Sequence, residues 1–210
     1  MFSIDAITLH VSDPAAARAF YANAFGLERQ LRFRAAAEPS DGFRGFTLSL
    51  VVAQPADVDA LVGAALDGGA TALKPPKKSF WGYGAVVQAP DGTIWKVATS
   101  ARRDSGPATG EIDDVVLLLG VENVGASKRF YVERGLTVDK SFPGKYVQFD
   151  AAPGGITLAL YGRKALAKDA GVAPEGSGSH RITIGGGAGA FTDPDGFGWE
   201  PAPAAVLSAG

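Results

Sequence analysis

The chain has 210 residues, among them 20 Lys and Arg, 22 Asp and Glu and no cysteine, and its formal net charge is −2. This balance gives no reason to expect a nucleic acid or an acidic membrane surface as partner. The lack of cysteine excludes disulfides, thiolate metal ligands and a thiol nucleophile. The N-terminus has no leader pattern and no apolar run approaches the roughly 18 residues of a spanning helix, so we expect a soluble, cytoplasmic protein.

The first half is predicted to alternate short strands with two helices. Residues 4–11 alternate as a strand, with apolar residues on one face and Ala6, Thr8 and His10 on the other. Asp13 is placed to cap a helix that runs from Pro14 to about residue 25, before a glycine. A second helix begins after Pro55 and ends at residues 68–69. The further strands are predicted at 27–33, 46–52, 72–74, 84–88 and 94–98.

The end of this half is written twice. Residues 90–98, Pro-Asp-Gly-Thr-Ile-Trp-Lys-Val-Ala, return as residues 194–202, Pro-Asp-Gly-Phe-Gly-Trp-Glu-Pro-Ala. Pro-Asp-Gly is a tight-turn sequence, because Pro presets φ and Gly accepts a positive φ. The Trp that follows anchors one face of the last strand, and the next position, Lys96 or Glu200, points to the other face.

The second half repeats the pattern in abbreviated form. Phe-Tyr at 130–131 mirrors Phe-Tyr at 20–21, and Ile-Asp at 112–113 echoes Ile-Asp at 4–5. Such matched landmarks predict an internal duplication, with halves at 1–101 and 111–203, a linker at 102–110 and a tail at 204–210. The glycine-rich run 185–189 is interpreted as a short connection that replaces the second helix. Strands are predicted at 115–119, 138–142, 146–149, 156–161 and 179–184, and helices at 126–134 and 163–170.

These elements together resemble the vicinal oxygen chelate superfamily, which includes glyoxalase I, bleomycin-resistance proteins and extradiol dioxygenases. The resemblance rests on the first strand, on the start of the second helix, on the hairpin from Lys74 to Gly92, and on the segments 158–171 and 193–200. It implies an α+β fold of tandem βαβββ modules, whose curved mixed sheets form a cup that holds a ligand. Because one fold hosts many activities, the resemblance does not fix the function.

The resemblance also implies where a metal would bind. In the first half the ligand positions of the superfamily read Ala6, Phe46 or Thr47, and Lys96. A lysine would place a cation where the metal cation binds, and Coulomb repulsion disfavours that arrangement. We therefore expect the first half to be free of metal.

The same positions in the second half read Asp114, His180 and Glu200. Two carboxylates and an imidazole, with water as a fourth ligand, are an open catalytic arrangement. The alternative interpretation is that both carboxylates are solvated strand ends and the histidine is a loop residue.

The geometry of the superfamily predicts which side chains line the cup. The expected ligand-binding residues are Thr8, His10, Leu48, Leu50, Trp81, Tyr83 and Lys96. His10 has the alternative role of a strand histidine that is hydrogen-bonded to a neighbour. The aromatic residues 80–83 either close over one end of the cup, where they would suit a planar ligand, or cap the core.

We thus predict a glyoxalase/bleomycin-resistance-like protein that binds a small, partly apolar or aromatic molecule without a metal or other cofactor. The alternative is a metal-dependent lyase, isomerase or dioxygenase that uses Asp114, His180 and Glu200, so enzymatic activity stays open. A third hypothesis is a catalytically idle module that only dimerises, which predicts a filled cup. Apart from the small molecule, a homodimer is the only partner considered, and no catalytic residue is assigned.

Overall fold

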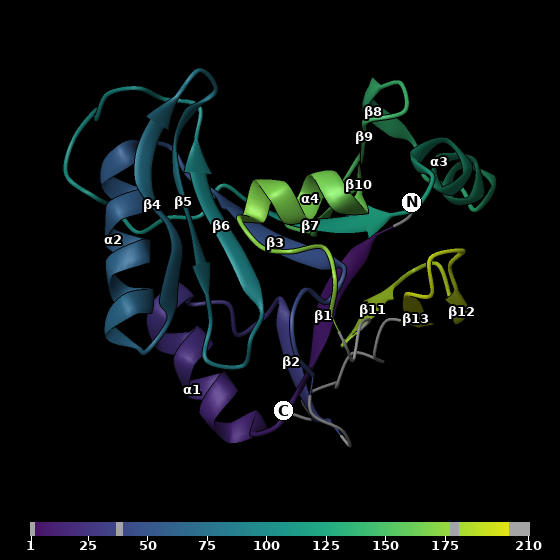
Figure 1. Ribbon diagram of the computed structural model, residues 1–210, viewed down its shortest axis with the longest axis horizontal. Helices are drawn as coiled ribbons and strands as arrows, with labels where there is room; N and C mark the ends of the chain where they lie inside the picture. Colours follow the sequence, from purple (N-terminus) through teal and green to yellow (C-terminus); the bar gives the residue numbers. More distant parts are fainter. Residues whose placement is uncertain (1–2, 37–39, 177–180, 202–210) are drawn as a thin grey trace, which may run out of the picture.

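The computed structural model describes residues 3–36, 40–176 and 181–201, and this part of the chain forms four helices and two mixed sheets (Figure 1). The first half contains β1 (Ile4–Val11), α1 (Pro14–Phe25), β2 (Leu31–Ala35), β3 (Phe46–Val51), α2 (Pro55–Asp67), β4 (Thr71–Ser79), β5 (Gly82–Gln88) and β6 (Ile94–Thr99). The second half contains β7 (Asp114–Val121), α3 (Val124–Glu133), β8 (Val138–Phe142), β9 (Tyr146–Phe149), β10 (Thr157–Gly162), α4 (Arg163–Ala170), β11 (Ile182–Gly186), β12 (Phe191–Thr192) and β13 (Gly198–Pro201).

Helix α1 shows why local sequence predicted its ends. The Asp13 carboxylate accepts hydrogen bonds from the backbone N–H groups of Ala15 and Ala16, and Pro14 occupies the first turn. At the other end Gly26 adopts the left-handed conformation, with φ of 65°, which a side chain would strain. Each cap bonds only to residues a few positions away in the chain, and the predicted bounds of this helix are confirmed.

Each sheet contains strands from both halves of the chain. The eight-stranded sheet has the order β4-β5-β6-β3-β7-β10-β9-β8, and the five-stranded sheet has the order β12-β13-β11-β1-β2. The halves meet where β3 pairs antiparallel with β7, and again where β1 pairs antiparallel with β11. The two halves are therefore interleaved through shared sheets and do not form separate lobes. The expected α+β fold with curved mixed sheets is confirmed.

The main core lies on the sheet faces that pack against α1, α2 and α3. The repeated tryptophan has the same role in both halves. Trp95 packs against Tyr21 of α1 and donates its indole N–H to the tyrosine hydroxyl at 3.1 Å, and that hydroxyl contacts Asp91. Trp199 and Tyr131 repeat this pair in the second half, where the tyrosine hydroxyl donates to Asp193, two positions before the Asp195 that corresponds to Asp91. Burial, reinforced by the nearby aspartate charge, raises the pKa of both tyrosines, so each phenol stays a proton donor.

The segment 102–110 is fastened to the start of α2. The Gln54 side chain accepts hydrogen bonds from the backbone N–H groups of Ser105 and Gly106. The Asp57 carboxylate accepts bonds from the N–H groups of Thr109 and Gly110. This connection therefore follows a defined path between the halves. Within the described residues, no helix is long and apolar enough to cross a membrane.

Candidate functional site

Helix α4 covers the middle of the face of the eight-stranded sheet that is opposite α1 and α2, and it packs on β3, β7 and β10. Its residues Leu166, Ala167 and Ala170 are buried in a second core, together with Phe43 and Val86. Figure 1 shows α4 lying across β3 and β7. We call this surface the α4 face.

Both ends of α4 are held by other elements. At its start, the Arg163 guanidinium donates to the carbonyl of Phe43 at 3.2 Å and lies over the phenyl ring. Gly45 beside it has a φ of 87°, in the left-handed region that favours glycine, and an added Cβ would lie 2.3 Å from the Arg163 guanidinium. At its end, Lys74 donates to the carbonyl of Lys168 at 3.0 Å, a favourable place for a cation.

Three of the expected cup residues occupy β3 and β6, but on different faces. Lys96 does lie on the α4 face, where its ammonium forms an ion pair of 2.8 Å with Asp169. Leu48 and Leu50 lie on the other face, because Leu48 is in register with Trp95 and both leucines are fully buried in the main core. The expectation that these leucines share a face with Lys96 is therefore wrong.

The two aromatic residues at the tip of the hairpin neither close over a cup nor cap the core. Trp81 lies at the turn between β4 and β5, where 83% of its surface is exposed, and Phe80 beside it is 79% exposed. The Tyr83 hydroxyl donates to the Asp59 carboxylate of α2 at 2.8 Å. Both interpretations are wrong for Phe80 and Trp81, which face solvent, whereas the partly buried Tyr83 packs against the main core and fastens the hairpin to α2.

Polar side chains gather on one face of the five-stranded sheet, which we call the polar face. Strand β1 turns Ile7 and Leu9 into the core and presents Thr8 and His10 on the polar face. Because Thr8 is opposite Thr183 in the antiparallel pair of β1 and β11, Thr183 points the same way. Helix α3 packs on the opposite face of this sheet, where its Tyr131 contacts Trp199 of β13 and its Phe130 contacts Phe191 of β12.

Hydrogen bonds connect the side chains of the polar face. Glu200 of β13 accepts from the Thr8 hydroxyl at 3.4 Å and from the Arg34 guanidinium of β2 at 3.2 Å. The Nε2 atom of His10 lies 2.9 Å from the Thr183 hydroxyl. His10, Thr183 and Glu200 are half-buried and Arg34 is exposed, so solvent reaches the cluster.

The charges around His10 favour its neutral form. Burial lowers the pKa of His10, and the positive charges of Arg34 and Arg181 lower it further, while the Glu200 carboxylate opposes them. His10 can therefore donate or accept a hydrogen bond at neutral pH, according to its tautomer. The sequence did not single out Arg34 or Thr183. Each lies on a strand that pairs with β1 and points to the polar face, and this pairing is the only signal that could have found them.

The alternative metal-ligand set is not brought together by the described residues. Asp114 begins β7 of the eight-stranded sheet and accepts from the Thr157 hydroxyl at 3.0 Å, whereas Glu200 belongs to the five-stranded sheet. The guanidinium of Arg34 already occupies the position beside Glu200 that a cation would take. His180 lies outside the described residues. Residues 3–36, 40–176 and 181–201 contain no group of three acidic or histidine side chains placed to hold an ion.

Comparison with solved structures identifies the fold. Glyoxalase I from Zea mays superposes with a TM-score of 0.63 at 16% identity, over 95% of this chain and 91% of that one. Its V278E mutant gives 0.61 at 17% identity, over 96% and 92%. A putative dioxygenase from Bacillus subtilis gives 0.53 at 16% identity, over 92% of this chain and 71% of that one. The chain has the glyoxalase fold.

The likeness extends to the architecture and not to the sequence. No protein-family model matches the chain, and a comparison with curated proteins finds no match either. At 16–17% identity the structural relatives establish the glyoxalase fold alone. The resemblance to the vicinal oxygen chelate superfamily is thereby confirmed for the fold. The site must be argued from the residues of this chain.

Proposed function

We propose that this glyoxalase-fold protein binds a small carboxylate-bearing molecule on the polar face, without a metal. The observation that carries the proposal is the convergence of Arg34, His10, Thr8 and Glu200 on the polar face of the five-stranded sheet, whereas α4 covers the middle of one face of the eight-stranded sheet. The proposal keeps the small-molecule function and the contacts of Thr8 and His10 expected from the sequence, and it omits the expected contacts on the eight-stranded sheet.

Charge supports an anionic ligand. Arg32 and Arg34 occupy alternate positions of β2, in register with Thr8 and His10, and Glu200 is the acidic side chain that contacts this group. A guanidinium binds a carboxylate through parallel hydrogen bonds, which adds geometric specificity to charge attraction. Hydroxyl groups such as that of Thr8 can donate to the same ligand.

Two substitutions with opposite effects test this assignment. Arg34→Gln should weaken binding of benzoate at least about tenfold, because it removes a charged hydrogen-bond donor. Glu200→Gln should strengthen benzoate binding, because it removes a repelling charge and releases the guanidinium. Isothermal titration calorimetry measures both, with benzamide as the uncharged ligand and Arg102→Gln at a distant exposed arginine as the control.

Three binding results would contradict the proposal. Benzoate that does not bind saturably, benzoate and benzamide that bind equally, or an Arg102→Gln loss equal to that of Arg34→Gln would each refute the polar-face site. Elemental analysis of protein purified without chelators tests the remaining part. A stoichiometric divalent metal whose removal abolishes benzoate binding would refute binding without a metal.

Acidification should increase the affinity for benzoate. The pKa of His10 lies below its ordinary value of 6.5, so its positive charge, beside Arg34 and Arg181, is gained only as the pH falls below that value towards 5. Benzoate remains ionised in this range, as carboxylates do until about pH 4. We expect a severalfold increase by calorimetry, and a flatter pH profile in His10→Gln. An affinity that falls on acidification would contradict a role for His10.

A further inference from the structure

The turn of the β4–β5 hairpin forms an aromatic and basic surface that the polar face does not use. Trp81 is 83% exposed and Phe80 is 79% exposed, more than any other large apolar side chain among the described residues. The two rings lie edge to face, with their centres 5.2 Å apart. Figure 1 shows this turn at the upper end of the hairpin, far from the five-stranded sheet. We call residues 77–82 the hairpin tip.

The fold holds the two rings of the hairpin tip in solvent. The backbone N–H of Trp81 donates to the Ser79 hydroxyl at 3.2 Å, and the Arg102 guanidinium donates to the Phe80 carbonyl at 2.9 Å. Gly82 has a φ of 128° and lies too close to the backbone of β6 for a side chain to fit. The exposure of both rings therefore belongs to a fastened turn. An exposed apolar surface of this kind marks a site of interaction with a partner.

Positive charge surrounds these rings. Lys77 and Lys78 precede them on β4, and Arg102 contacts the turn from beyond the end of β6. Residues 68–90 contain no aspartate or glutamate. Neither lysine forms an ion pair with another residue in the described part of the chain. The Asp59 carboxylate of α2 accepts a hydrogen bond from the Tyr83 hydroxyl at the base of the turn. The hairpin tip is thus cationic, although the formal net charge of the chain is −2.

We infer that the hairpin tip docks the protein on a membrane surface that contains anionic lipids. Aromatic rings enter the interfacial region of a bilayer, and lysines beside them are attracted by anionic headgroups. The net charge of the chain opposes this contact only weakly, because charges farther than about 8 Å from the lipid surface are largely screened at physiological ionic strength. The expectation that an acidic membrane surface is not a partner rested on the net charge, and it does not extend to this local surface.

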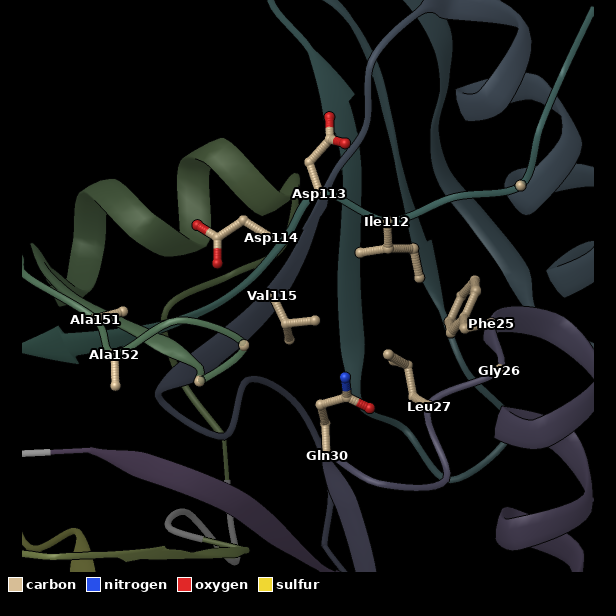
Figure 2. A pocket seen from close by; sticks show the side chains of 13 residues that line it. Phe25, Gly26, Leu27, Gln30, Ile112, Asp113, Asp114, Val115, Ala151 and Ala152 are labelled. Carbon is tan, nitrogen blue, oxygen red and sulfur yellow. The ribbon is translucent and has the colours of Figure 1, made fainter.

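A second copy of the chain fits the hairpin tip less well. The adjoining strand β4 lies at the edge of its sheet and contains Pro75, Pro76 and three lysines, which are residues that prevent an edge strand from pairing with another chain. A cavity of about 410 Å³ between the end of α1 and the start of β7 has room for a ring. Its Asp113 and Asp114 carboxylates, however, point away from its apolar wall, so they would not face the lysines of an inserted tip (Figure 2).

Vesicles that differ in charge test the inference. At low salt the protein should co-sediment with vesicles of phosphatidylcholine and about 30% phosphatidylglycerol, and it should bind phosphatidylcholine alone at least about tenfold more weakly. Because Trp95 and Trp199 are buried, a shift of the tryptophan emission to shorter wavelengths on binding reports on Trp81. The inference is wrong if the anionic vesicles do not bind the protein or if both kinds of vesicle bind it equally.

Two variants assign the contact to the hairpin tip. Trp81→Ala should weaken co-sedimentation with the anionic vesicles at least about tenfold, because it removes a ring that leaves water on docking. The double variant Lys77→Gln/Lys78→Gln should also weaken it at least about tenfold, because each basic residue near an anionic leaflet contributes about fivefold. The affinity for benzoate should be unchanged in both variants, so this inference and the polar-face proposal can fail separately.

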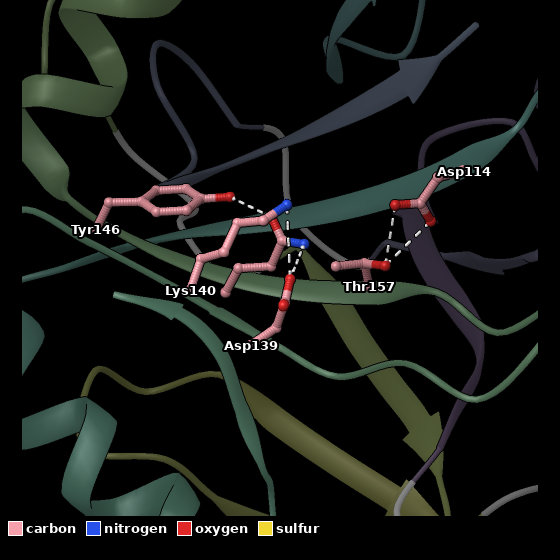
Figure 3. A network of polar contacts seen from close by, with 6 residues as sticks. Asp114, Asp139, Lys140, Tyr146 and Thr157 are labelled. Atoms are coloured by element: carbon pink, nitrogen blue, oxygen red, sulfur yellow. Dashed lines mark hydrogen bonds and ion pairs between the residues drawn. The ribbon is translucent and has the colours of Figure 1, made fainter. Parts of the chain in front are cut away.

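The matched control is Phe142→Ala. Phe142 is 61% exposed at the end of β8, but the nearby Lys140 forms an ion pair of 3.6 Å with Asp139 (Figure 3). This variant should bind the anionic vesicles as the unaltered protein does. Equal losses in Phe142→Ala and Trp81→Ala, or unaltered binding in Trp81→Ala, would overturn the inference. So would a dimer in sedimentation velocity that Trp81→Ala dissociates, because it would assign the hairpin tip to a second copy.

Discussion

Replacing Trp95 by alanine should lower the free energy of unfolding by about 3–5 kcal/mol, the range for deletion of a large buried aromatic side chain. Trp95 is fully buried, and its ring centre lies 5.4 Å from that of Tyr21 and 5.2 Å from that of Phe25. The substitution removes these contacts and leaves a cavity between β6 and α1. It also removes the indole donor of the Tyr21 hydroxyl. Urea denaturation followed by circular dichroism measures the loss.

The matched control for this prediction is Trp81→Ala. Trp81 has the same side chain, but it lies at the exposed hairpin tip, so its loss should change the free energy of unfolding by less than about 0.5 kcal/mol. Equal losses in the two variants would contradict the buried role of Trp95 or the exposed position of Trp81. The comparison also tests why the sequence repeats Asp-Gly-x-x-Trp, since Trp199 packs against Tyr131 in the same manner.

Local sequence predicted those features whose causes lie within one segment. The caps of α1 at Asp13 and Gly26 are an example, and so is the short helix at 163–170, which α4 matches. The internal duplication was also visible, because the tyrosine and tryptophan of each copy must meet for the core to form. These signals gave the glyoxalase fold, since the order of elements restricts how the sheets can pair.

The side of a sheet that a residue faces was harder to predict. All but the last residue of β3 are buried, because α1 and α2 cover one face and α4 covers the other. A strand buried on both faces has no alternation of polar and apolar residues. The register between Leu48 and Trp95, which decides the face, is a contact between distant segments.

The candidate site had the same limitation. Thr8 and His10 were predicted from the alternation of β1, which is a local pattern. Arg34 and Thr183 join them only through the pairing of β1 with β2 and β11, and Thr183 is separated from His10 by 173 positions in the chain. A cavity of about 410 Å³ between the end of α1, the residues before β7 and the loop between β9 and β10 has no motif at all, because these three segments come together only through the interleaving of the halves.

Whether α4 is part of the core or a removable cover has consequences for the function. A helix that could leave its position would expose the α4 face and Lys96 as a second binding surface. The contacts argue for a permanent element: Leu166 is fully buried in the second core, and the helix is fastened at both ends by Arg163 and Lys74. Local opening with little loss of global stability is typical of segments with few buried contacts.

Leu166→Ala should therefore lower the free energy of unfolding of the whole protein by about 2–5 kcal/mol, because the lost methyl groups leave a cavity between α4 and β7. Lys164→Ala, on the exposed side of the same helix, should change it by less than about 0.5 kcal/mol. Native-state hydrogen exchange of Leu166→Ala should then show reduced protection of β3 and β7 together with α4. If protection fell in α4 alone while global unfolding in urea was unchanged, α4 would be a removable cover. The face of the eight-stranded sheet beneath it would then be a candidate ligand-binding surface.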